Sequence, residues 1–98
     1  MTAYLIAAID VHDAERYAAY RDRVPALVAA FGGRYLVRGG EQQTLEGAWP
    51  GARTVVMVFA DRARAEAFYN SEAYREIVGI RRQAATGAVI IVDGVADS

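Results

Sequence analysis

Arg34 and Arg38 stand at the two ends of the segment GGRYLVRGG, residues 32–40, in which glycine pairs bracket a short strand pattern. A guanidinium beside a cavity binds a carboxylate or enolate through its planar fork of N–H donors. Side chains alternate along a strand, so both arginines should lie on one face, about 13 Å apart. Either could instead pair with Glu41, Glu46 or a carboxylate of a partner subunit. We carry Arg38 forward as a candidate catalytic residue and Arg34 as a candidate ligand-binding residue.

Arg81 continues the apolar stripe of a predicted helix, seven residues after Tyr74. Burying an arginine without a partner is costly, so Arg81 either extends to the rim of the core or binds a ligand. Tyr69 and Tyr74 flank a break at Asn70-Ser71. Their hydroxyls are either satisfied within the core or directed into a pocket. We treat Tyr69, Tyr74 and Arg81 as candidate ligand-binding residues.

Two further candidates lie in predicted loops. Trp49 belongs to a segment rich in Gly and Pro, where a large ring either covers a cavity or fills a dimer seam. His12 is the only histidine and lies between Asp10 and Asp13, so a carboxylate could orient it as a general base. The competing interpretation is a solvated loop histidine. Trp49 is thus a candidate ligand-binding residue and His12 a candidate catalytic one.

Several kinds of chemistry lack the residues that they need. One histidine and no cysteine cannot build a transition-metal cluster at the usual spacing. Haem iron needs only one axial ligand, so this argument does not reach haem, although no pattern indicates it. The glycine pairs match neither a dinucleotide fingerprint nor a phosphate loop, and there is no Gly-x-Ser-x-Gly turn. We predict no cofactor and no metal site.

Hydrophobic periodicity predicts the elements that position these residues. The predicted strands cover residues 4–11, 34–38, 53–60 and 88–93, and the predicted helices cover residues 14–31 and 62–85, the second with a break at Asn70-Ser71. Residues 41–45 either extend the second strand or pair beside it. The order β-α-β-β-α-β predicts a ferredoxin-like α+β fold, with the helices on one face of an antiparallel sheet.

The helices carry their own start signals. Asp13, Asp61 and Ser71 precede the predicted helical segments, where a side-chain oxygen accepts a backbone N–H of the first turn. Pro25 lies inside the first helix, but the apolar stripe keeps its phase across it. We therefore predict one helix, kinked near residues 22–23, rather than two.

The strands are apolar on both faces. In the third strand Met57 and Phe59 lie on one face, while Val56 and Val58 lie on the other. Helices can cover only one face, and a bare apolar sheet is a larger patch than monomers usually expose. The pattern predicts a homodimer that buries the second face against another copy.

Composition limits the remaining possibilities. A chain of 98 residues is expected to form a single domain over residues 1–98. The formal net charge is −1 with no basic cluster, which argues against a nucleic-acid partner. There is no cysteine, no signal-peptide pattern and no apolar run long enough to span a bilayer. We therefore expect no membrane partner and a cytoplasmic location.

Several segments together resemble the family known as domain of unknown function 1330, within the dimeric α+β barrel superfamily. They are YLIA at 4–7, YAAY at 17–20, GGRYLVRGG at 32–40, LEG at 45–47, Trp49, the strand 55–59, and AFYNS at 67–71 leading to Tyr74. The resemblance implies a dimeric barrel with a pocket between sheet and helices, and it implies no particular reaction. The wider superfamily includes cofactor-free monooxygenases, haem-degrading oxygenases and small isomerases, which is an analogy of fold.

Two functions follow as hypotheses. The first is a dimer that binds, and transforms, a small aromatic, anionic or enolisable metabolite, by analogy as a cofactor-independent monooxygenase or an isomerase. The second is a non-catalytic ligand-binding or protein-interaction dimer. The chain has few groups suited to proton transfer, which keeps the second hypothesis open.

Overall fold

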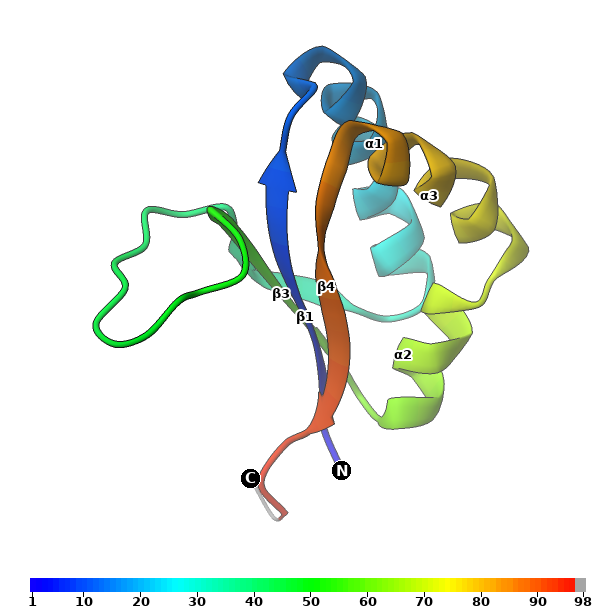
Figure 1. Cartoon of the computed structure of the whole chain (residues 1–98). Coiled ribbons are helices and arrows are strands. Elements are labelled where there is room, and N and C mark those ends of the chain that lie inside the picture. Colours follow the sequence, from blue (N-terminus) through cyan, green and yellow to red (C-terminus); the bar gives the residue numbers. More distant parts are fainter. Residues whose placement is uncertain (97–98) are drawn as a thin grey trace.

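Four strands and three helices make up the described part of the chain, residues 1–96 of the computed structural model. The elements are β1 (Ala3–Val11), α1 (Ala14–Ala30), β2 (Arg34–Arg38), β3 (Arg53–Phe59), α2 (Arg62–Tyr69), α3 (Glu72–Ala84) and β4 (Ala85–Asp93). The strands form one antiparallel sheet in the order β2-β3-β1-β4. The helices lie together on one side of it (Figure 1). This is the predicted ferredoxin-like α+β fold.

The helices begin where the sequence predicts. Asp13, Asp61 and Ser71 each accept the backbone N–H three residues later, at 3.0, 2.8 and 3.2 Å. These bonds satisfy donors that a helix cannot satisfy within itself. α1 runs through Pro25 as one helix, so the prediction of a single helix is confirmed, whereas the kink near residues 22–23 stays a prediction.

Two expectations about the strands are wrong. Residues 41–45 form no strand; they belong to a loop, residues 39–52, which we call the arm and which projects from the side opposite the helices (Figure 1). β4 begins at Ala85 instead of after Gly87. Gly87 lies within the strand, at a position where a Cβ would collide with the backbone oxygen of Ala8. The glycine permits close approach of two strands rather than ending one.

A β-bulge in β2 corrects the predicted placement of its arginines. Arg34 pairs with Val58 of β3, whereas Arg38 pairs with Val55, with a shift in register between them. Val55 and Val58 point to opposite faces of the sheet, because their separation is odd. The extra residue of the bulge reverses the alternation. Arg34 and Arg38 therefore lie on opposite faces, and the expectation that they share one is wrong.

The two faces of the sheet differ in what covers them. On the face toward the helices, which we call the covered face, Leu5, Ile9 and Phe59 pack with helix residues such as Phe68 into the core. No helix among residues 1–96 packs on the other face, which we call the open face. Its apolar side chains remain accessible, with Ile90 55% exposed. The prediction that both faces are apolar is confirmed.

Candidate functional site

A small cavity lies between the covered face and the helices α1 and α3. Its volume is about 30 Å³, enough for one or two water-sized groups. Apolar side chains of the sheet, including Leu5 and Met57, form one wall. Among residues 1–96, the ionisable side chains that line it are all arginines and tyrosines, and no carboxylate is present. The site therefore carries positive charge with no acidic counter-charge.

Two of the lining arginines are partly or wholly buried without an ion-pair partner in the described chain. Arg81 of α3 is 8% exposed, and its Nε has no hydrogen-bond partner. Arg53, at the start of β3, also has a buried Nε without a partner, and its guanidinium lies 5.5 Å from the centre of the Tyr17 ring. Arg81 is thus buried in the core instead of extending to the rim.

Arg38 is held by the backbone and by a ring. Its Nη2 donates to the carbonyl oxygen of Arg21 in α1 at 2.7 Å. Its guanidinium lies 4.9 Å from the centre of the Tyr35 ring. Neither contact neutralises its charge, and the ion pairs of the described residues do not include Arg38. Arg38 therefore remains able to bind an anion at the edge of the cavity.

Two of the tyrosines that line the cavity, Tyr20 and Tyr35, have raised pKa values. The hydroxyls of Tyr20 and Tyr74 lie 2.7 Å apart. Burial, reinforced by the neighbouring Tyr74, raises the pKa of Tyr20 far above its ordinary value. Burial also raises the pKa of Tyr35, although Arg38 opposes the shift. Phenols with such raised pKa values stay protonated at neutral pH, so they cannot balance the arginine charge.

Arg81 keeps its charge in this setting. Burial lowers the pKa of Arg81, but the neighbouring Tyr74 and Tyr20 raise it by more. Because an arginine is protonated at neutral pH in any case, Arg81 is a cation while these phenols are still neutral. The cavity thus combines a fixed cation with neutral donors.

Unsatisfied polar atoms gather at this one place. Within residues 1–96, the buried side-chain nitrogen and oxygen atoms without a hydrogen-bond partner are Tyr35 Oη, Arg53 Nε and Arg81 Nε, and all three residues line the cavity. Buried polar groups are normally paired. Each of these atoms carries a hydrogen that it can donate. The arrangement therefore suits a hydrogen-bond acceptor, above all an anionic one.

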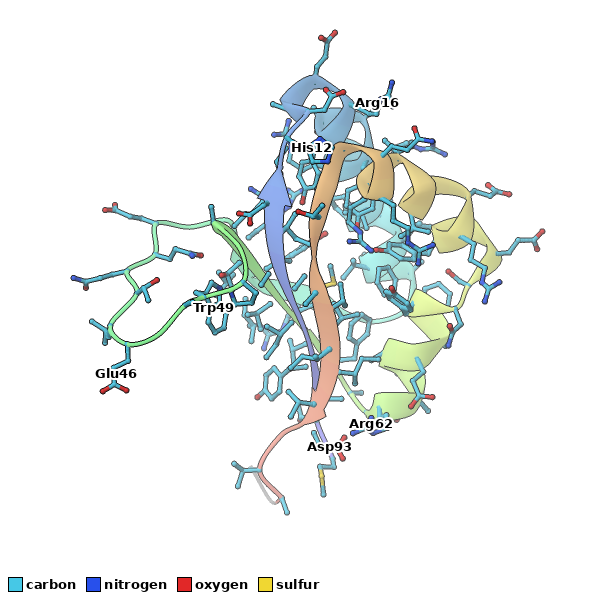
Figure 2. The ribbon with its side chains drawn as sticks, viewed as in Figure 1. His12, Arg16, Glu46, Trp49, Arg62 and Asp93 are labelled. Carbon is cyan, nitrogen blue, oxygen red and sulfur yellow. The ribbon has the colours of Figure 1, made fainter. Side chains whose placement is uncertain are left out.

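The structure brings only some of the predicted site residues together. Arg38, Tyr74 and Arg81 line the cavity. Tyr69 packs behind it, with its ring centre 5.4 Å from that of Tyr74. His12 is exposed where β1 leads into α1, and it is not among the cavity-lining residues (Figure 2).

Arg34 and Trp49 lie away from the cavity. Arg34 is on the open face, as its pairing with Val58 shows. Trp49 belongs to the arm and lies beside the sheet, where its Nε1 donates to Thr54 Oγ1 at 3.0 Å (Figure 2). No group of three or more His, Cys, Asp or Glu side chains in residues 1–96 is arranged to hold a metal ion.

A family model described as "Domain of unknown function (DUF1330)" matches residues 2–95. The chain belongs to this family. It is similar in structure to RPA0582, a protein of unknown function from Rhodopseudomonas palustris, with a TM-score of 0.75, 19% identity, and coverage of 96% of this chain and 82% of that one. A comparison with curated proteins found no match.

Two other solved structures share the fold of this DUF1330 protein. SnoaB, a cofactor-independent oxygenase from Streptomyces nogalater, has a TM-score of 0.63 at 12% identity, covering 96% of this chain and 93% of that one. HapK from Hahella chejuensis has a TM-score of 0.60 at 16% identity, covering 98% and 95%. At these identities the similarity establishes the fold alone.

Sequence reasoning on this DUF1330 chain missed Arg53, Tyr20 and Tyr35. Arg53 could have been found, because it precedes Val55 by two residues and so continues the covered face of the third strand. Tyr20 is part of the apolar stripe of the first helix, where its type and spacing indicate ordinary core. Tyr35 could not have been placed, since its facing depends on the bulge.

Proposed function

We propose that this DUF1330 protein binds a small metabolite through an anionic group, a carboxylate or an enolate, seated in the cavity. The observation that carries the proposal is that three unpartnered buried donors belong to Tyr35, Arg53 and Arg81, which all line one carboxylate-free cavity. An anion would satisfy these donors and balance the charge of Arg81.

The size of the cavity limits what it can enclose. A volume of about 30 Å³ admits one or two water-sized groups, so only the oxygen atoms of an anionic head group would lie inside it. The exposed Arg21 and Arg38 are both lining residues, so the cavity opens between α1 and β2. The remainder of a larger ligand would extend through this opening, where the ring of Tyr35 and the guanidinium of Arg38 favour an aromatic substituent.

Stabilising negative charge is the chemistry that this site would supply to a reaction. Donors already oriented toward a developing enolate lower the barrier to forming it. The fold of the oxygenase SnoaB is compatible with such a role but does not require it. Cofactor-independent oxygenation or isomerisation therefore remains the catalytic form of the proposal.

One observation favours binding without turnover. Among the residues that line the cavity, no His, Asp or Glu is present to act as a general base. The raised pKa of Tyr20 makes it a poor base at neutral pH. A non-catalytic ligand-binding dimer is therefore the second candidate.

The open face supports a homodimer as part of the same proposal. Ile90 and Val92 of β4 are 55% and 41% exposed, and Val37 of β2 is 40% exposed. A second copy would bury these side chains against their equivalents.

A cytoplasmic location belongs to the proposal too, and the absence of cysteine is compatible with a reducing compartment. Within residues 1–96, no helix is long and apolar enough to cross a membrane.

A paired titration tests the proposal. Acetate and benzoate are titrated by NMR against their neutral amides, acetamide and benzamide, and native mass spectrometry of gently purified protein looks for a retained ligand. We expect the carboxylates to bind, the amides not to bind, and Arg81→Met to weaken carboxylate binding about tenfold or more. Arg23→Met is the matched control, because Arg23 is exposed on α1 and does not line the cavity. Equal binding of acid and amide, or no effect of Arg81→Met, would contradict the proposal.

A further inference from the structure

Pro25 lies well inside α1, which continues for five residues beyond it to Ala30. In an α-helix the N–H of residue 25 would donate to the carbonyl of Arg21, four residues earlier. Proline has no N–H, and its ring presses against that same carbonyl and tilts it away from the helix axis. The carbonyl oxygen of Arg21 is therefore left without its helical donor.

That carbonyl is the one that Arg38 uses. Arg38 Nη2 donates to Arg21 O at 2.7 Å, which ties the end of β2 to the middle of α1. Both residues line the cavity, and both are exposed. The Arg21 carbonyl oxygen thus lacks its helical hydrogen bond and accepts one from the sheet instead.

The kind of acceptor matters for the charge at the opening. A carboxylate holding Arg38 would neutralise it and compete with an incoming anion. A backbone carbonyl fixes the guanidinium but leaves its net charge in place. The Tyr35 ring, 4.9 Å away, supports a second side without adding charge. Arg38 is thereby oriented and still cationic.

We propose that Pro25 is a positioning residue for the anion site: by leaving the Arg21 carbonyl free, it fixes Arg38 at the opening of the cavity. The role at the site rests on the proposed function, whereas the fixing of Arg38 does not. With any other residue at position 25, a helical N–H would donate to one of the two lone pairs of the carbonyl oxygen, and Arg38 would share that oxygen with it. The proline therefore removes one bond within the helix and leaves the oxygen to the bond between helix and sheet.

The ligand-free test uses Pro25→Ala, with Pro50→Ala as the matched control because Pro50 lies in the arm. Phenylglyoxal labelling of the folded protein, read out by peptide mass spectrometry, reports the reactivity of each arginine. We expect the labelling rate of Arg38 to rise several-fold in Pro25→Ala and that of Arg16 to stay constant, while the melting temperature rises. Unchanged labelling of Arg38 would overturn the inference.

A double-mutant cycle gives a second, independent measurement. In urea unfolding, Arg38→Ala should lower the stability of the wild-type protein more than that of Pro25→Ala, since the bond is weakened in the latter. Equal losses in both backgrounds would mean that Pro25 and Arg38 are not coupled, which contradicts the proposal.

The affinity for benzoate then tests the role at the site. We expect its Kd to rise about fivefold in Pro25→Ala, the effect of one net hydrogen bond, and to stay unchanged in Pro50→Ala. Loss of affinity in a protein of raised melting temperature is not what a purely structural defect produces. Released Arg38 with unchanged affinity would overturn the positioning role. If the wild type binds no carboxylate, the proposed function fails, whereas the labelling and the cycle still decide whether Pro25 fixes Arg38.

Discussion

The covered and open faces of the sheet are built from the same strands, yet each is incomplete in a different way. On the covered face the apolar side chains are satisfied, with Phe59 1% exposed, and what remains unsatisfied is polar: the donors around the cavity. On the open face Ile90 and Val92 remain exposed. An anion would satisfy the unpartnered donors of the covered face, and apolar surface would bury the exposed side chains of the open face.

The two proposed partners, a small anionic ligand and a second copy of the chain, would therefore bind to different faces of the sheet. A ligand that fits between Arg53 and Arg81 cannot satisfy Ile90, which points away from the cavity. A second copy packed on Ile90 leaves the donors of the cavity unchanged. Substitutions on one face should therefore leave the property of the other face intact.

The largest effect is expected from Phe68→Ala on the covered side. Phe68 is 0% exposed, and its ring packs against those of Phe31, Phe59 and Tyr74 at centroid distances of 6.2, 5.6 and 4.8 Å. Removing it should lower the free energy of unfolding by about 3–5 kcal/mol, measured by urea denaturation. Leu45→Ala, in the exposed arm, is the control and should change stability by less than about 0.5 kcal/mol. A comparable loss in both variants would contradict the assignment of the core to the covered side.

A smaller effect, confined to assembly, is expected from Ile90→Glu on the open face. A charge buried without a partner in a dimer interface should raise the dimer dissociation constant about 100-fold or more. Sedimentation velocity over a range of concentrations measures it. Gln83→Glu, exposed on α3, adds the same charge on the helix side and should leave assembly unchanged. A stable dimer of Ile90→Glu would mean that the open face is not the dimer interface.

The smallest effect at neutral pH is expected from Tyr20→Phe, whose consequence appears in alkali. The pKa of Tyr20 is raised by burial, so above the unfolded-state pKa of about 10 the unfolded chain loses a proton that the folded chain keeps. Stability must then fall as pH rises, by up to about 1.4 kcal/mol per pH unit for one group, and it should not change through this group below pH 9. Urea denaturation between pH 8 and about 11 should show a shallower fall for Tyr20→Phe than for Tyr4→Phe, on the open face. Identical slopes would mean that the Tyr20 hydroxyl is not held neutral by burial.

Features that depend on a few neighbouring residues were predictable from the sequence. The three caps, at Asp13, Asp61 and Ser71, require only a side-chain oxygen at the right position, and all three were identified. Arg81 was singled out because a charged residue interrupted an apolar stripe, and that signal also needs no partner to be known. Local chemistry thus gave the helix starts and one residue of the cavity.

Features that depend on how distant segments meet were not predictable. The bulge in β2 places Arg34 and Arg38 on opposite faces, and it exists only in the pairing with β3. The sequence pattern predicts a strand break at Gly87, because it does not show that this glycine packs closely against Ala8 of the neighbouring strand. The role that we propose for Pro25 depends on the bond from Arg38 to the Arg21 carbonyl, and the sequence of the helix does not predict that bond.

Trp49 is the only tryptophan of the chain, and it lies in the arm beside Thr54, on the side of the open face. Tyr20, Tyr35 and Tyr74 surround the cavity on the other side of the sheet. The protein thus carries two spectroscopic reporters in separate places. The fluorescence emission maximum of Trp49 should shift when the open face loses water on association. The near-ultraviolet circular dichroism of the tyrosines should change when a ligand occupies the cavity. Because Tyr4 lies on the open face, the tyrosine signal is assigned to the cavity by comparison with Tyr4→Phe.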